Sequence, residues 1–241
     1  MKIVEKIIKK QQNLSLNPAV TIALLGDSVT QGCFECYTKE DENIDTVFDA
    51  DSSYGSRLKS MLNLLYPTVQ FNFINAGISG DSAKGGLKRL ERDVLSFHPD
   101  LVIVGFALND AVCLGEGGIN EYKKTMAEIL TKIAASGAES IVLTPNAMNT
   151  NVSCHLKEKP LLKLAKNMEK VQKSGVLESY AEAAKAVAAE NGAVVCDVYS
   201  VWKSMIQAGV NVTELLANKL NHPVRQMHYL TAMMLCECIL R

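Results

Sequence analysis

Residues 20–28 read VTIALLGDS, and this stretch decides the fold. The run from Val20 to Leu25 predicts a buried strand, and Gly26-Asp27 then ends that strand and presents Ser28. Further short apolar runs follow at residues 69–75, 101–107, 140–144 and 193–198. Continuous apolar strands of this kind are typical of a parallel sheet that is covered on both faces.

Segments with helical periodicity separate these runs, at residues 54–66, 84–97, 120–136 and 174–190, and a last helix is predicted at 228–240. Strands that alternate with helices predict an α/β fold with right-handed crossovers. We therefore expect a three-layer α/β/α sandwich around a five-stranded parallel sheet. No repeat or linker interrupts the chain, so residues 1–241 are predicted to form one domain that begins with a short amphipathic helix over residues 1–13.

Two segments depart from this pattern. Residues 33–53 are rich in acidic side chains and show no clear periodicity, and residues 146–173 form a long insertion after the fourth strand. Loops of this length in a compact domain are usually functional or mobile. Both follow the carboxyl ends of strands, so we expect both near one edge of the sheet, and residues 33–53 could form a lid or a docking segment for a partner.

Composition excludes several function classes. Hydrophobic residues make up 48% of the chain, and the formal net charge of −1 gives no electrostatic reason to expect a nucleic acid or an anionic membrane as partner. No apolar run reaches the ~20 residues that cross a bilayer, and the N-terminus lacks a secretory signal pattern. We expect a cytoplasmic protein. The basic pairs Lys9-Lys10 and Lys88-Arg89 are expected on solvated helix faces, and the oligomeric state stays open.

The cysteines do not predict a disulfide framework. The chain has 7 of them, an odd number that fits a reducing compartment. Cys33-x-x-Cys36 and Cys236-x-Cys238 could be halves of a zinc site. We favour small buried thiols at these positions, and we expect no metal.

Polar residues follow the predicted strands at the edge where a parallel α/β sheet binds ligands. They are Ser28 after the first strand, the turn Asn75–Asp81 after the second, Asn109-Asp110 after the third and His222 near the C-terminus. A serine hydroxyl becomes a nucleophile when a base such as a neutral imidazole takes its proton. The backbone N–H groups of Ser28 and Gly80 and the Asn109 amide could then stabilise the oxyanion of a tetrahedral intermediate.

These four blocks resemble, in order and spacing, the signature blocks of the SGNH (GDSL-type) hydrolase family. The resemblance spans roughly residues 20–240 and implies a flavodoxin-like sheet of order 2-1-3-4-5. It also implies a lipase-like ester or thioester hydrolase that works through an acyl-serine without metal or cofactor. Carried over position by position, it makes Ser28 the nucleophile, Gly80 and Asn109 oxyanion donors, and His222 the base.

One position departs from the family pattern. The family usually has an aspartate three residues before the histidine, and this chain has Lys219 there. A lysine cannot accept the imidazole N–H. The group that orients His222 could instead be Asn218, Glu214, Asp197 or a backbone carbonyl.

Each candidate also has a structural interpretation. Ser28 could simply be a helix N-cap. His98 is predicted at the opposite edge of the sheet, His155 in a solvated loop, and His228 packing or capping in the last helix.

The preferred function is a carboxylic ester hydrolase, with a mild preference for short acyl groups on a carbohydrate or small alcohol. Alternatives are a lysophospholipase or thioesterase of the same family, a non-catalytic binding protein on this scaffold, and a flavodoxin-like or receiver-like module. A small ester is the expected partner in the preferred case.

Overall fold

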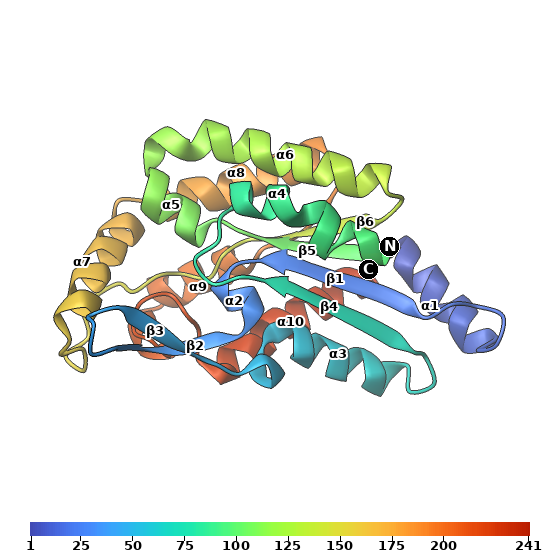
Figure 1. The fold of residues 1–241 in the computed structure, drawn as a ribbon, viewed down its shortest axis with the longest axis horizontal. Coiled ribbons are helices and arrows are strands. Elements are labelled where there is room, and N and C mark those ends of the chain that lie inside the picture. Colours follow the sequence, from blue (N-terminus) through green and yellow to red (C-terminus); the bar gives the residue numbers. More distant parts are fainter.

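The computed structural model describes residues 1–241 and contains a five-stranded parallel sheet in the order β4-β1-β5-β6-β7 (Figure 1). Its strands are β1 (Val20–Gly26), β4 (Phe71–Gly77), β5 (Leu101–Gly105), β6 (Glu139–Leu143) and β7 (Val194–Cys196). When only these strands are counted, the order is 2-1-3-4-5, so the expected topology is confirmed. The central strands β1 and β5 are apolar runs that are buried on both faces, whereas the edge strand β4 has exposed positions at Asn72 and Asn75.

Helices cover both faces of this sheet, which confirms the three-layer architecture (Figure 1). Side chains of β1 alternate between two cores: Ala23 and Leu25 enter one, and Ile22 and Leu24 enter the other. The first core is shared with α4 (Ala83–Asp93), α5 (Leu108–Leu114), α6 (Ile119–Ala135), α7 (Lys159–Lys173) and α8 (Val176–Glu190). The second is shared with α1 (Lys2–Gln12), α3 (Tyr54–Leu65), α9 (Val198–Gln207) and α10 (Arg225–Leu240).

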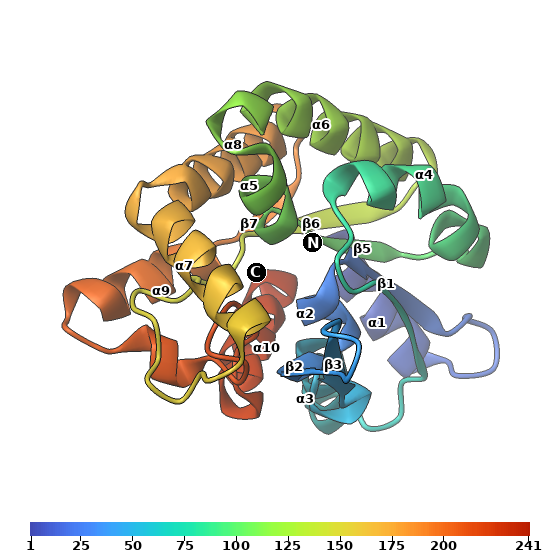
Figure 2. The same cartoon turned by 60° about the vertical axis from the view of Figure 1, so that its left-hand side comes forward.

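Both insertions contain regular secondary structure. Residues 33–53 contain an antiparallel hairpin, β2 (Cys33–Thr38) and β3 (Ile44–Phe48), which pairs with no strand of the main sheet. Residues 146–173 contain α7, which buries Leu161, Ala165 and Met168 at helical spacing, a pattern that the prediction overlooked. The hairpin and α7 lie beyond the carboxyl ends of the strands, as Figure 2 shows from that side.

Short segments complete the fold. They are α2 (Ser28–Gln31) and the 3₁₀ turns Ala50–Ser52, Leu95–Phe97, Glu116–Gly118 and Val212–Leu215. The predicted N-terminal helix is present as α1, but Lys10 is buried instead of solvated. Its ammonium group donates to the carbonyls of Leu14 and Asn17, and these bonds compensate the burial of its charge.

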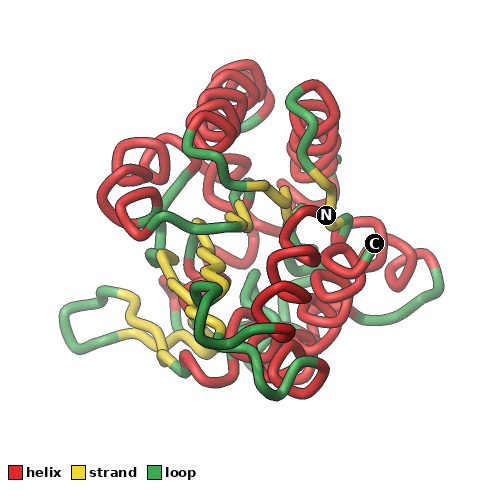
Figure 3. Tube along the Cα trace, turned by 90° about the vertical axis from the view of Figure 1, so that its right-hand side faces the viewer, coloured by secondary structure: helices red, strands yellow, loops and turns green.

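Both termini lie at the amino end of the strands (Figure 1), away from the edge that carries the polar loops, and they lie close together in the view of Figure 3. None of the helices is both long and apolar enough to serve as a membrane span.

Candidate active site

Three glycines lie side by side where the central strands end. Gly26 of β1 pairs with Gly77 of β4 on one side and with Gly105 of β5 on the other. A Cβ at Gly26 would lie 2.0 Å from Thr30 Oγ1, and one at Gly77 would lie 2.3 Å from the Gln31 nitrogen. The missing side chains therefore let α2 pack directly on the strand ends.

Ser28 is the first residue of α2, and it is buried. The N-cap is Asp27, whose carboxylate accepts from the Val29 N–H at 2.9 Å. The N-cap role considered for Ser28 is thus taken by its neighbour, and the Ser28 hydroxyl is available for other contacts.

His222 contacts two groups that lie far from it in the sequence. Its Nε2 lies 3.0 Å from Ser28 Oγ, and its Nδ1 lies 2.9 Å from the Phe34 carbonyl oxygen. A carbonyl can only accept, so Nδ1 carries the proton and Nε2 is left to accept from the serine hydroxyl. This is the tautomer that a general base on Ser28 requires.

The backbone carbonyl is the one candidate of the four that orients His222. Lys219 and Glu214 pair with each other at 2.8 Å. Asp197 caps α9 through Ser200. Asn218 acts on the loop backbone instead, because its side-chain oxygen accepts the N–H groups of Leu220, Asn221 and His222.

Burial sets the charge state of this histidine. Desolvation lowers the pKa of His222 to about 4, although the Phe34 carbonyl and the Glu35 carboxylate both act to raise it. The imidazole is therefore neutral near pH 7 and can accept a proton.

The predicted oxyanion donors lie on the neighbouring loops. Gly80 has φ +78°, a left-handed conformation that favours glycine, and its N–H has no acceptor. A Cβ there would meet no protein atom, so backbone conformation rather than lack of room requires this glycine. The Asn109 side chain donates one N–H to the Asp81 carbonyl at 2.8 Å, which fixes the amide and leaves its second N–H free.

The Gly80 loop is tied to the last residue of β1 and to α2, the helix that carries Ser28. The Ile78 N–H donates to the Gly26 carbonyl at 3.1 Å, and the Ser79 N–H donates to Gln31 Oε1 at 2.6 Å. Gly80 and Asn109 together line a recess of about 230 Å³. The structure thus places Ser28 in contact with His222, and Gly80 beside Asn109, on loops that hydrogen bonds join.

Comparison with known proteins identifies the family. The model of the GDSL-like lipase/acylhydrolase family matches residues 24–230. This chain belongs to that family. The expected resemblance and the esterase class are therefore confirmed, while the roles of individual residues remain predictions.

Individual relatives share less than 30% of their aligned residues with this chain. An acetylxylan esterase of Geobacillus stearothermophilus is 27% identical over 89 residues, which span 37% of this chain and only 39% of that relative. A lipase/acylhydrolase structure from Enterococcus faecalis has a TM-score of 0.68 at 21% identity and covers 91% of this chain and 95% of its own. An acetylxylan esterase structure from Geobacillus stearothermophilus has a TM-score of 0.64 at 20% identity and covers 92% and 93%. At 21% and 20% sequence identity, these two structural matches show a shared fold and no more.

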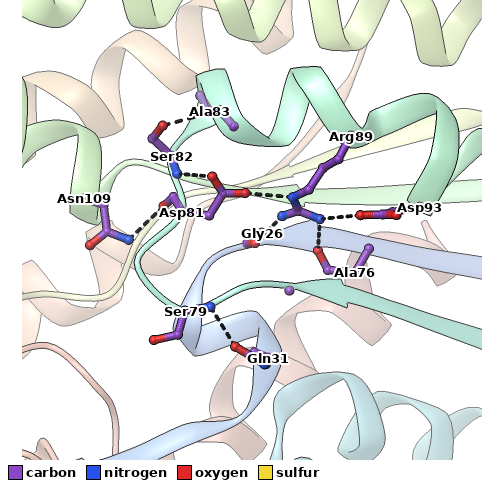
Figure 4. A network of polar contacts seen from close by, with 12 residues as sticks. Gly26, Gln31, Ala76, Ser79, Asp81, Ser82, Ala83, Arg89, Asp93 and Asn109 are labelled. Carbon is purple, nitrogen blue, oxygen red and sulfur yellow. Dashed lines mark hydrogen bonds and ion pairs between the residues drawn. The ribbon is translucent and has the colours of Figure 1, made fainter. Parts of the chain in front are cut away.

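In this GDSL-like chain a buried arginine organises the strand ends (Figure 4). Arg89, expected on a solvated helix face, is only 7% exposed. Its guanidinium donates to the carbonyls of Gly26 and Ala76 at 2.9 and 2.5 Å, and to Asp81 Oδ2 at 2.7 Å. Asp81 follows Gly80 and holds Asn109, so one side chain joins the end of β1, which leads into Ser28, to the loop that carries Gly80. The apolar spacing of α4 was the only sequence signal that could have placed Arg89 inward.

Two buried carboxyl groups support the same loops. Burial raises the pKa of Asp27 to about 7 and that of Asp110 to about 6. Asp110 accepts from the Ala83 N–H at 3.1 Å and so holds the start of α4.

The remaining histidines and the cysteines lie outside the contacts described above. His228 Nδ1 accepts from the Tyr54 N–H at 3.0 Å at the start of α3, and His98 and His155 are exposed. Cys33 and Cys236 are buried, and no cluster of three or more His, Cys, Asp or Glu side chains could hold a metal ion.

Replacing Arg89 by Gln should destabilise the fold. Arg89 and Asp81 side chains are 8% and 15% exposed, so the substitution leaves a largely buried carboxylate without its partner, a loss of about 3–5 kcal/mol. Urea unfolding measures this. Arg92→Gln is the matched control, because Arg92 is exposed on the same helix and pairs with Asp93. Equal unfolding midpoints for the two variants would contradict the role given to Arg89.

Proposed function

We propose that this chain hydrolyses carboxylic esters through an acyl-serine intermediate on Ser28, with His222 as general base and acid. The observation that carries the proposal is the hydrogen-bonded line from the Ser28 hydroxyl through both ring nitrogens of His222 to the Phe34 carbonyl. That line supplies a nucleophile, a base and a group that fixes the tautomer of the base.

The first half-reaction acylates the enzyme. Ser28 Oγ attacks the ester carbonyl carbon while His222 Nε2 takes the hydroxyl proton. Negative charge moves to the former carbonyl oxygen, where the N–H groups of Ser28 and Gly80 and the Asn109 amide can meet it. The carbon–oxygen bond to the alcohol then breaks, and Nε2 returns the proton to the departing oxygen.

The second half-reaction releases the acid. Water attacks the acyl-serine while Nε2 takes a proton from it, and the bond to Ser28 Oγ breaks as that proton passes back to the serine. In both halves His222 is transiently a cation, and the Phe34 carbonyl dipole stabilises it through the Nδ1–H bond. A carbonyl carries less negative charge than the usual carboxylate, so this stabilisation is weaker.

The recess beside the oxyanion donors favours a short acyl group on a hydroxylated alcohol such as a carbohydrate. Its lining combines the polar side chains of Ser82, Lys84, Glu121 and Thr125 with those of Cys113, Leu114 and Tyr122, and Lys84 pairs with Glu121 at 2.7 Å. A fatty acyl chain would bury apolar surface against charged groups there. The partial match to an acetylxylan esterase supports the same choice.

Two rival functions are tested by the same measurements. A lysophospholipase or thioesterase of this family would prefer long acyl chains or thioesters. A non-catalytic binding protein was suggested by Lys219, but the Phe34 carbonyl supplies an acceptor for His222 Nδ1 without the aspartate.

Ser28→Ala should abolish ester hydrolysis. The substitution removes the nucleophile, so kcat for p-nitrophenyl acetate should fall by about a thousandfold or more. A fluorophosphonate should label Ser28 in the wild-type chain and leave Ser28→Ala unlabelled, and Ser60→Ala, on the exposed side of α3, is the control. A folded wild-type chain that takes no label and cleaves no ester would favour the binding protein. Faster cleavage of long-chain than of acetyl esters would contradict the substrate choice.

The pH profile should report the buried imidazole. Only neutral His222 can act as base, and its pKa is lowered to about 4, so kcat/KM should hold through pH 5 and fall as the pH drops through about 4. Circular dichroism at each pH separates this loss from acid unfolding. Asp27 and Asp110, whose pKa values are raised to about 7 and 6, titrate in the neighbouring range. An acidic limb centred at the ordinary imidazole value of about 6.5 that persists in Asp27→Asn and Asp110→Asn would show that His222 is not desolvated as the structure has it.

A further inference from the structure

The carbonyl that orients His222 belongs to an element outside the main sheet. Phe34 lies in β2, and the β2–β3 hairpin forms no ladder with the five-stranded sheet. Ser28 and the loops of Gly80 and Asn109 follow strand ends of the main sheet, whereas Phe34 belongs to the hairpin. Its buried ring lies 4.9 Å from the His228 ring, and its carbonyl follows the backbone of β2. The contacts that hold the hairpin therefore decide the geometry at Nδ1 of the base.

Arg225 contacts the hairpin at Phe34 and at its neighbour Glu35. Its guanidinium forms a bidentate pair with Glu35, at 2.6 and 3.2 Å, and its Nε donates to Asp49 Oδ2 at 2.7 Å. Glu35 is in β2, and Asp49 follows the last residue of β3, so one side chain holds both strands. The guanidinium carbon also lies 4.2 Å from the centre of the Phe34 ring.

The same arginine is linked rigidly to the base. Arg225 is the first residue of α10 and lies three positions after His222. The backbone between them is fixed, because the Val224 N–H donates to the Leu215 carbonyl at 2.9 Å. Arg225 therefore couples the two partners of one hydrogen bond, His222 through the chain and Phe34 through the hairpin.

Stability alone does not explain this arrangement. The side chains of Arg225, Glu35 and Asp49 are 34%, 46% and 31% exposed, and ion pairs with this much solvent contribute little to folding. Other contacts keep the hairpin folded: the Asp49 N–H donates to the Gly32 carbonyl at 2.8 Å, and the Thr38 N–H donates to Glu158 at 2.6 Å. Bidentate pairing to arginine adds orientation more than energy.

We propose that Arg225 is a positioning residue for the reaction, which clamps the β2–β3 hairpin so that the Phe34 carbonyl holds His222 in its Nδ1–H tautomer. The inference rests on the proposed function, because it concerns the base of that reaction. It assigns the acidic insertion at residues 33–53 a part in catalysis, since this segment supplies both the carbonyl and the carboxylates that Arg225 grips.

The test compares Arg225→Gln and Arg225→Lys with Arg241→Gln, which breaks an exposed pair with Glu237 at the other end of α10. Loss of a hydrogen bond to the charged imidazole should lower kcat about ten- to a hundredfold in Arg225→Gln while KM changes little. Arg225→Lys should recover only part of this loss, because lysine keeps the charge but cannot form the bidentate pair. Arg241→Gln should match the wild type.

Nitrogen-15 spectra of the histidine side chains separate positioning from folding, with His222 assigned through His222→Gln. In the wild-type chain the two ring nitrogens of His222 should show the distinct shifts of a single Nδ1–H tautomer, and in Arg225→Gln the shifts should converge as tautomers mix. Unchanged shifts, or a kcat within about twofold of Arg241→Gln, would overturn the proposal.

The same set of variants also covers two other results: an Arg225→Gln chain that does not fold, and a wild-type chain without esterase activity. If Arg225→Gln does not fold, Glu35→Gln removes the opposite half of the clamp; it should show the same convergence, and wild-type shifts in that variant would overturn the proposal. A wild-type chain that hydrolyses no ester would overturn the proposed function instead. The nitrogen shifts would still report whether Arg225 fixes the tautomer.

Discussion

The imidazole of His222 can accept a proton from Ser28 only while its other nitrogen stays protonated, and the rest of the site depends on this constraint. In this chain a main-chain carbonyl, that of Phe34, meets the requirement. A carbonyl cannot be lost through a side-chain substitution, but it can be moved by any change in the backbone that carries it. The family position normally held by an aspartate is therefore free to carry Lys219, which pairs with Glu214 instead.

Two arginines hold the two sides of the site, one through buried hydrogen bonds and the other through partly exposed ion pairs. Arg89 is buried and donates to the Gly26 and Ala76 carbonyls at the strand ends and to Asp81, so it links the fold's core to the loop that carries Gly80. Arg225 is partly exposed and grips the hairpin through Glu35 and Asp49. Removing a buried charge partner costs stability, whereas loosening an exposed clamp chiefly costs geometry. Substitution of Arg89 should therefore chiefly lower the free energy of unfolding, whereas substitution of Arg225 should chiefly change the geometry of the site.

Burial of His222 sets its charge state in a site where a carbonyl, instead of a carboxylate, accepts from Nδ1. The low pKa of His222 keeps the resting imidazole neutral, whereas a carboxylate partner at Nδ1 would raise that pKa. The same desolvation makes the imidazolium of the reaction harder to form, so each remaining stabilising contact matters more. The recess beside Gly80 and Asn109 carries the Lys84–Glu121 ion pair, on which the proposal of a small oxygen-rich substrate rests.

Much of the architecture could be predicted from local pattern. The apolar runs located all five strands of the sheet, and the ends of those strands located the loops that carry Ser28, Gly80 and Asn109. The hairpin at residues 33–53 could not be predicted, because its strands are half exposed and its acidic residues obscure the alternation. Arg89 was placed on the wrong face because charge was given more weight than its position on α4.

By itself, the sequence determined the order of strands and helices and the edge where the polar loops meet, because hydrophobic periodicity and short-range turn chemistry act locally. Only the tertiary structure decided which group orients His222. That group is a carbonyl, which every residue possesses, and it lies 188 positions away from the imidazole. The sequence does not show which backbone carbonyl contacts His222, because that contact forms only when folding brings the segments of Phe34 and His222 together.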